Sequence, residues 1–361
     1  MSKTASKKKL IFKDIIDRNA EENSNTIIKS SSRYNSIDKN SENGIIEVYE
    51  HNFIQEIKKI CELSEEYNYI GMDTEFPGIV FSENFYYKTL KKNVDKLKLI
   101  QLGITLTNEK GEYPKNYPYH TWQFNLKFDE NIELYKDDSI KLLKECGINF
   151  DKLRTNGINT NLFAEYLTIS NLVLNPNIHW VSFQGSYDFG YLLRLLINRE
   201  LPEDEDEFIN LLNVFFVDYY DIRMLVKGNN NSQIGLNKLA AKLEVKREGQ
   251  IHQAGSDSLV TIDVFFKLKK LGLVDNKKLE EYKNILYGIG KGQDNEETFT
   301  YTPIGGMNSN MNYQNSNINN ILYLNQLNSK YMNVYNYPMI INNQNNLLLN
   351  KNNSGQMQTV I

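Results

Sequence analysis

The chain has 361 residues, 40% of them hydrophobic and 24% charged, and a formal net charge of −4. This length is enough for one large domain or two small ones with well-formed cores. A negative net charge argues against a protein that binds nucleic acid through an excess of basic residues. Metal ions bound in a site can still supply positive charge locally. Cys61 and Cys146 lack the spacing of a disulfide framework or a zinc site, so we expect two small buried hydrophobic residues.

The N-terminal segment, residues 1–43, is rich in Ser, Asn and Lys and has little hydrophobic periodicity, which predicts a disordered polar extension. Its three lysines at 7–9 suit a solvated tail, with a targeting patch as the alternative. The apolar run that follows, residues 10–12, is too short for a signal peptide, and no later run is long enough to span a membrane. We therefore expect a soluble intracellular protein with no membrane partner.

Ordered structure is expected to begin near Ile45, and apolar residues at helical spacing predict a helix over 54–63. Three strands are expected next. They cover 69–72 (ending in Asp73 and Glu75), 98–106 and 121–128. A turn-rich stretch joins the second of these strands to the third, so the three strands together predict an antiparallel meander.

Helical and strand patterns alternate after the meander. Helices are predicted over 139–144, 161–169, 191–197, 236–243 and 258–271, and strands over 179–183 and 214–220. A meander followed by β-α units indicates an α/β fold in which a mixed sheet is flanked by helices. The sequence then becomes Asn-rich and almost uncharged, which predicts a low-complexity tail over 293–361 and leaves a central domain over 44–292.

Asp73 and Glu75 are the most informative residues of the chain. They stand two apart at the end of a strand, so their side chains point to the same face. Neighbouring carboxylates on an apolar element repel each other and lose hydration, an arrangement that makes sense when divalent cations lie between them. Alone, the pair would be read as a strand end turning into solvent at Pro77-Gly78.

Two later segments carry further candidates. Asp188 stands near the start of a predicted helix, where an Asp is commonly just an N-terminal cap. His252 and Asp257 are five residues apart, which would separate them by about 140° around a continuous helix. Gly255 favours His252 in the preceding loop with Asp257 in the first helical turn, so that both can face one site. Taken singly, each aspartate is better explained as a cap.

Taken together, these residues form an ordered set of four carboxylates and one histidine. Such a set can hold two Mg²⁺ or Mn²⁺ ions, which prefer oxygen ligands. Two ions about 4 Å apart can clamp the attacking and leaving oxygens of a phosphoryl displacement. His252 would accept the proton of the attacking water, because the reference pKa of histidine is near 6.5. Zinc-hydrolase chemistry is disfavoured because the ligand set is not rich in histidine.

The residues around this set resemble those of one family of DEDDh exonucleases, the Caf/Pop deadenylase subunit of the Ccr–Not complex. The resemblance covers about residues 45–290. Its motifs are MDTEFPG at 72–78, NVD at 93–95, IQLG at 100–103, TWQFN at 121–125, YDFGYL at 187–192 and HQAGSDS at 252–258. One departure is Gln184-Gly185-Ser186, where many relatives have His-Ser-Gly; it removes no ligand, and its effect on substrate contacts is open.

The resemblance implies an RNase H-like fold and removal of mRNA poly(A) tails from the 3′ end with release of 5′-AMP. By position, Asp73, Glu75, Asp188 and Asp257 match the family's metal ligands, and His252 matches the catalytic base. It further implies that the substrate is poly(A) RNA and that the partners are a Not scaffold protein and a second deadenylase. The expected location of the protein is the cytoplasm and the nucleus. Two alternatives stay open: a DEDDh exonuclease acting on another polymer such as DNA, and a non-catalytic scaffold subunit.

Overall fold

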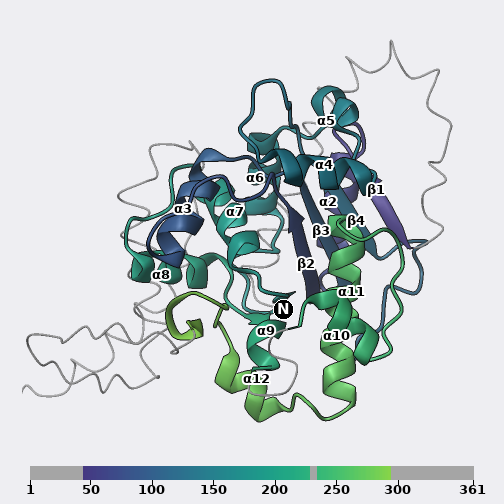
Figure 1. Ribbon diagram of the computed structural model, residues 1–361. Coiled ribbons are helices and arrows are strands. Elements are labelled where there is room, and N and C mark those ends of the chain that lie inside the picture. The colour runs from purple at the N-terminus through teal and green to yellow at the C-terminus, as the bar shows by residue number, and fades with distance from the viewer. Residues whose placement is uncertain (1–43, 228–233, 294–361) are drawn as a thin grey trace, which may run out of the picture. The chain divides into compact units, whose positions relative to one another are not determined.

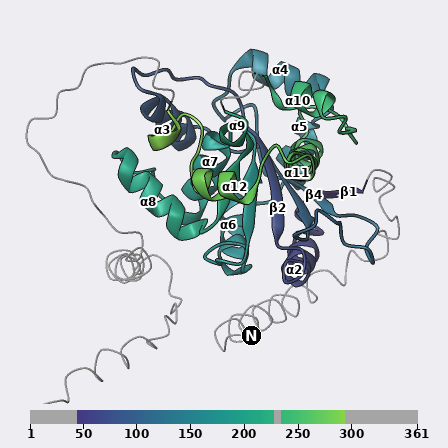
Figure 2. The same cartoon turned by 90° about the horizontal axis from the view of Figure 1, so that it is seen from below.

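The computed structural model describes residues 44–227 and 234–293, which form a sheet with helices on both faces (Figures 1 and 2). The six strands lie in the order β1-β4-β3-β2-β5-β6. They are β1 (Ile45–Val48), β2 (Tyr69–Glu75), β3 (Gln101–Thr107), β4 (Thr121–Asn125), β5 (His179–Ser182) and β6 (Tyr219–Asp221). The predicted tails, 1–43 and 293–361, lie outside the described residues apart from Gln293.

Helices connect the strands and cover the sheet. Those described are α2 (Phe53–Leu63), α3 (Tyr86–Lys96), α4 (Asp137–Glu145), α5 (Phe150–Asn156), α6 (Thr160–Ile169), α7 (Ser186–Ile197), α8 (Glu205–Phe215), α9 (Ile222–Leu225), α10 (Leu236–Lys242), α11 (Ala254–Lys270), α12 (Asn276–Tyr282) and a closing 3-10 turn, η2 (Gly290–Gly292). None of these helices is long and apolar enough to cross a membrane.

The strand pairing confirms the predicted mixed sheet. Strands β2, β3 and β4 pair antiparallel as the expected meander, whereas the β1–β4, β2–β5 and β5–β6 pairs are parallel. Every residue of β3 is buried, as expected for a strand in the middle of a sheet covered on both faces. In the antiparallel register Asp73 lies opposite Gly103, and Glu75 lies opposite Gln101. The predicted α/β class is therefore correct, and its sheet brings the two acidic residues to one end of β2.

The alternation of side chains along the strands divides the helices between the two faces. On one face, Thr105 hydrogen-bonds Ser258 of α11 over 2.9 Å. On the other face, the ring of Phe124 packs edge-on against Phe53 of α2 and Phe163 of α6. Since Asp73 and Glu75 share the face of Gly71, which lies under α11, they point to the α11 side of the sheet.

Two glycines let α11 lie directly on the sheet. A Cβ atom added to Gly103 would stand 1.8 Å from the carbonyl oxygen of Ala254, and one added to Gly71 would stand 2.6 Å from that of Ser258. Any side chain at these positions would push the helix away from the strands. The close approach brings Asp257, in the first turn of α11, to the end of β2 that carries Glu75.

One predicted strand is present but shorter and displaced. The strand expected near 214–220 is β6, which begins only at Tyr219 because α8 continues to Phe215. The apolar residues Leu211, Leu212 and Val214 form the buried side of that helix, and a short apolar run cannot be assigned to strand or helix by periodicity alone. The third strand is also shorter than predicted, ending at Asn125.

Several elements were not predicted from the sequence: β1, α3, α5, α8 and the short helices α9 and α12. Helix α3 is rich in lysine, and the apolar residues of its buried side are Tyr87, Leu90 and Val94. The predicted burial of the cysteines is confirmed for Cys146, whereas Cys61 is only half-buried.

Candidate active site

Strand β2 supplies the first two acidic residues of the site. Asp73 and Glu75 alternate with the buried Thr74, so the two carboxylates share one face while the Thr74 hydroxyl lies on the other. Burial raises the pKa of Asp73 well above its usual range, and the nearby charges of Asp257, Asp188 and Glu75 add to the effect. Burial likewise raises the pKa of Glu75, with Asp257 and Asp188 contributing. These carboxyl groups therefore share one electrostatic environment.

Asp188 comes from α7, on the other side of β2. It is the third residue of the helix and not the N-cap, which is Gly185. The Thr74 hydroxyl donates a hydrogen bond of 2.6 Å to Asp188 Oδ1, which ties α7 to β2 between Asp73 and Glu75. Burial raises the pKa of Asp188 to about 6, against the opposing effect of the Thr74 hydrogen bond.

The turn before α7 includes the residues that depart from the family wording. Gln184 adopts a left-handed backbone with φ of 58°. The backbone N–H groups of Gln184 and Gly185 donate to the two carboxylate oxygens of Asp221, over 2.8 and 3.2 Å. Asp221 is fully buried at the end of β6 and also accepts a backbone hydrogen bond from Arg223. This carboxylate holds the turn in place, and with it the start of the helix that carries Asp188.

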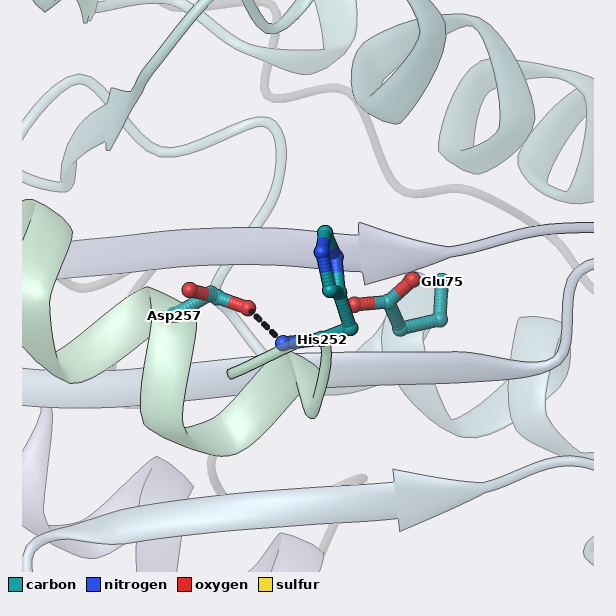
Figure 3. A group of neighbouring side chains, drawn as sticks. All are labelled: Glu75, His252 and Asp257. Atoms are coloured by element: carbon teal, nitrogen blue, oxygen red, sulfur yellow. Dashed lines mark hydrogen bonds between the residues drawn. The ribbon is translucent and has the colours of Figure 1, made fainter. Parts of the chain in front are cut away.

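His252 and Asp257 meet as the sequence predicts. His252 lies in the loop before α11, with a left-handed φ of 56°, and Asp257 lies in the first turn of the helix. The His252 backbone N–H donates to Asp257 Oδ2 over 2.9 Å, so Asp257 also anchors the loop. One potential ligand atom from each of Glu75, His252 and Asp257 lies within 4.8 Å of the other two (Figure 3).

Arg247 is a site residue that the sequence did not reveal. Its Nη2 atom donates to Asp257 Oδ1 over 2.6 Å, and its Nη1 atom donates to the Ser256 hydroxyl over 2.8 Å. The guanidinium charge also lowers the pKa of Asp73, opposing the effects that raise it. Arg247 precedes His252 in an irregular loop, so neither periodicity nor spacing marked it. Its charge offsets part of the crowded negative charge in the metal-free protein.

The N-terminus of α11 is held by glutamines on neighbouring strands. Gln123 Oε1 accepts the Gly255 N–H over 2.9 Å, and Gln101 Oε1 accepts the Ala254 N–H over 3.3 Å. The helix has no hydrogen bond from its own N-cap side chain, that of Gln253. The Gln253 side chain instead accepts a hydrogen bond from Gln123 Nε2 over 2.8 Å and donates to the Cys146 carbonyl over 2.7 Å. These buried amides fix the position of the first helical turn.

The donor set suits hard divalent cations. One carboxylate from β2 (Glu75) and one from α11 (Asp257) converge beside the imidazole, whereas Asp73 and Asp188 lie outside this group of three and act on it through their charges. Bound cations would offset the repulsion among these carboxylates, and the described residues offer no cluster of cysteines or histidines for zinc there. The arrangement can therefore accommodate metal ions beside a proton acceptor.

The sheet order and the acidic cluster at the end of β2 define an RNase H-like domain of the nuclease type. Comparison with known proteins gives the family: residues 48–168 match the model described as CAF1 family ribonuclease. A probable CCR4-associated factor 1 homolog of Arabidopsis thaliana is 45% identical over 258 residues, which is 68% of this chain and 93% of that protein. The chain belongs to the CAF1 family of ribonucleases.

Fission yeast supplies a relative and a solved structure. The poly(A) ribonuclease pop2 of Schizosaccharomyces pombe is 39% identical over 257 residues, covering 68% of this chain and 75% of that protein. The structure of S. pombe Pop2p with Mg²⁺ and Mn²⁺ bound superposes with a TM-score of 0.65 at 38% identity, covering 68% of this chain and all of that one. This relative therefore binds divalent cations on the fold that it shares with the present chain.

A second solved structure contains a partner protein. The CAF1 chain of yeast, crystallised with the NOT1 MIF4G domain, matches with a TM-score of 0.61 at 29% identity, covering 67% of this chain and 96% of that one. The family relationship predicted from the sequence motifs is therefore confirmed.

Proposed function

We propose that this protein is a metal-dependent 3′-to-5′ exoribonuclease that shortens the poly(A) tails of mRNA and releases 5′-AMP. The observation that carries the proposal is the convergence of Glu75, His252 and Asp257 within 4.8 Å, with Asp73 and Asp188 acting electrostatically on the same cluster. Membership of a ribonuclease family that includes a poly(A) ribonuclease supports the choice of substrate.

Each side chain has a role in the proposal. Asp73, Glu75, Asp188 and Asp257 would hold two Mg²⁺ or Mn²⁺ ions. Bound ions would lower the pKa of water and stabilise charge on the scissile phosphate. The His252 imidazole would accept the proton of the attacking water. Thr74 orients Asp188 through the 2.6 Å hydrogen bond, and Arg247 orients Asp257.

The proposed setting is the Ccr–Not complex, in the cytoplasm and nucleus. The CAF1 chain of yeast has been crystallised with the NOT1 MIF4G domain, which supports a Not scaffold as a partner of this chain as well. A second deadenylase is proposed from the family alone. A scaffold-only role is disfavoured because all five site positions are filled.

The test uses the full chain with an end-labelled RNA that terminates in a short A-tract, in Mg²⁺, in Mn²⁺ and in EDTA. We expect stepwise shortening from the 3′ end with 5′-AMP as product, no reaction in EDTA, and none from Asp73→Ala. The exposed Asp138 of α4 offers a matched control, Asp138→Ala, which keeps wild-type activity. Equal degradation of an oligo-dA strand would favour a general DEDDh exonuclease, and near-wild-type turnover by folded Asp73→Ala would overturn the metal-ion mechanism.

A further inference from the structure

An exposed apolar segment follows the first two acidic residues. In the loop between β2 and α3, Phe85 is 66% exposed, Ile79 45% and Val80 40%, and Tyr86, the first residue of α3, is 38% exposed. Exposed apolar side chains scattered singly over a surface need no explanation. Four within eight residues, here called the patch, concentrate exposed apolar surface in one short segment, which favours a binding role.

The segment is held rigidly at its base. Asn93 is fully buried, and its Oδ1 atom accepts the backbone N–H groups of Val80 and Phe81 over 2.8 and 3.0 Å. Its Nδ2 atom donates to the Phe81 carbonyl over 2.8 Å, and the Thr89 hydroxyl accepts the Glu83 N–H over 2.8 Å. Asn93 opens the NVD motif, for which the proposed chemistry gives no role. It fixes the backbone that presents the patch.

Aromatic contacts connect the patch to the acidic site. Phe76, directly after Glu75, stacks on Tyr187 at a ring-centroid distance of 5.2 Å. Tyr187 also meets Tyr86 edge-on at 6.3 Å, and the Tyr86 hydroxyl hydrogen-bonds the Ser186 hydroxyl over 2.6 Å. Helices α3 and α7 lie side by side in Figure 1, as these contacts require. Tyr86 is thus anchored beside Asp188, and the neighbouring Phe85 projects into solvent.

The ring of Phe85 stands where a capping side chain is expected. Phe85 is the N-cap of α3, a position that favours Ser, Thr, Asn or Asp, and it makes no capping hydrogen bond. The first turn of α3 carries no acidic residue. Lys88 Nζ lies 5.5 Å from the centre of the Phe85 ring, and Lys92 Nζ lies 5.4 Å from that of Phe81. Phe81 is half-buried and Lys92 is paired with Glu83, so the exposed combination is Phe85 with Lys88. An exposed ring with a lysine beside it is suited to a base and a phosphate of single-stranded RNA.

We propose that Phe85 is a stacking platform for a base near the 3′ end of the RNA, and that Lys88 pairs with an adjoining phosphate. The identity of the ligand rests on the proposed function, whereas the platform follows from the exposed ring and its continuity with the site. N-cap positions favour residues that can accept a hydrogen bond from the helix, and phenylalanine cannot. A residue that departs from such a local preference without stabilising the fold is often functional, and Phe85 is such a residue.

The test measures affinity and turnover separately in the full chain. Affinity is measured by fluorescence anisotropy of a labelled, non-hydrolysable oligoadenylate, and turnover by steady-state kinetics on A-tailed RNA. The variants are Phe85→Ala, Phe85→Leu and Phe85→Trp. Leu271→Ala is the matched control, since Leu271 is 53% exposed beyond the far end of α11. Phe85 makes no capping hydrogen bond, so all variants are expected to melt like the wild type.

The stacking role predicts a specific order of effects. Phe85→Ala and Phe85→Leu should weaken binding roughly 5- to 100-fold and raise KM with kcat little changed, while Phe85→Trp binds like the wild type. Wild-type affinity in Phe85→Ala or Phe85→Leu would overturn the platform, although A-tail removal would still support the proposed function. The opposite result is also informative. If the wild-type protein degraded no RNA but bound oligoadenylate more tightly than Phe85→Ala and Phe85→Leu did, the proposed function would be overturned and the platform supported.

Discussion

At the scale of single residues, the proton balance of the acidic cluster depends on pH. Burial and neighbouring carboxylates raise the pKa of Asp73 and Glu75, and burial raises the pKa of Asp188 to about 6. An acid whose pKa is raised by folding contributes stability below its unfolded pKa, near 4, and loses that contribution as pH rises through the folded value. The metal-free protein should therefore lose stability from these groups between about pH 4 and pH 6 or above.

Removing one of these charges should stabilise the metal-free protein. In EDTA we expect Asp73→Asn to melt at a higher temperature than the wild type, by a margin that grows as the pH rises above about 4, because the variant lacks one buried repulsive charge. Mg²⁺ should raise the melting temperature of the wild type more than that of the variant. Differential scanning fluorimetry measures both. Parallel melting curves across the pH range, with Asp138→Asn as the control, would contradict the proposed repulsion.

The backbone of His252 decides which substitution tests its role. Because φ is 56°, asparagine, which tolerates the left-handed region, is a better replacement than alanine. His252→Asn should keep the N–H bond to Asp257 and lower kcat on the order of 10²- to 10⁴-fold while binding oligoadenylate like the wild type. Turnover and anisotropy measurements separate the two effects. If affinity fell as much as rate, His252 would be a substrate contact.

At the scale of elements, α11 does most to organise the site. It carries Asp257, it lies against the glycines of β2 and β3, and side chains of β3 and β4 cap its N-terminus. Gln123 is 3% exposed and also donates to Glu47 over 2.7 Å. Its amide therefore supports the loop of His252 without touching the acidic cluster directly.

Gln123→Leu should destabilise the protein by about 1–3 kcal/mol, because the buried Gly255 N–H loses its acceptor. Activity should fall as well, through the positions of His252 and Asp257 and not through loss of a ligand. Gln55, exposed on α2, provides the matched control Gln55→Leu, which should change stability little. Urea denaturation gives the two free energies of unfolding. Equal values for both variants would show that the cap contributes nothing measurable.

At the scale of the whole molecule, the segments outside the central domain should be dispensable for chemistry. A trimmed chain of residues 44–293 contains every described element and the entire acidic cluster. It is one residue longer than the predicted domain, because Gln293 Nε2 donates to Glu205 over 3.1 Å. We expect cooperative folding and full metal-dependent activity, since the removed segments lack apolar periodicity. Thermal melts and initial rates are compared between the full-length and the trimmed protein. If activity were lost on trimming and returned only when the C-terminal segment was added, the end of the domain would lie beyond residue 293.

The fold class and the candidate site residues could both be predicted from the amino-acid sequence. Both followed from local patterns, since alternation and apolar periodicity mark the strands and most helices, and Asp73, Glu75, Asp188, His252 and Asp257 stand at the ends of such elements. The same local reasoning missed the lysine-rich α3, and it extended a strand into α8 because a short apolar run fits either structure.

Only the tertiary structure showed what surrounds those residues. Gln123 and Gly255 are 132 positions apart, and Thr74 and Asp188 are 114 apart, yet each pair is joined by a hydrogen bond. No spacing rule predicts such contacts, because the sheet order and the close approach of α11 decide which side chains meet. Arg247 and Phe85 became visible for the same reason. One lies in an irregular loop and the other at a helix start without a capping signal, so their neighbours exist only in the folded chain.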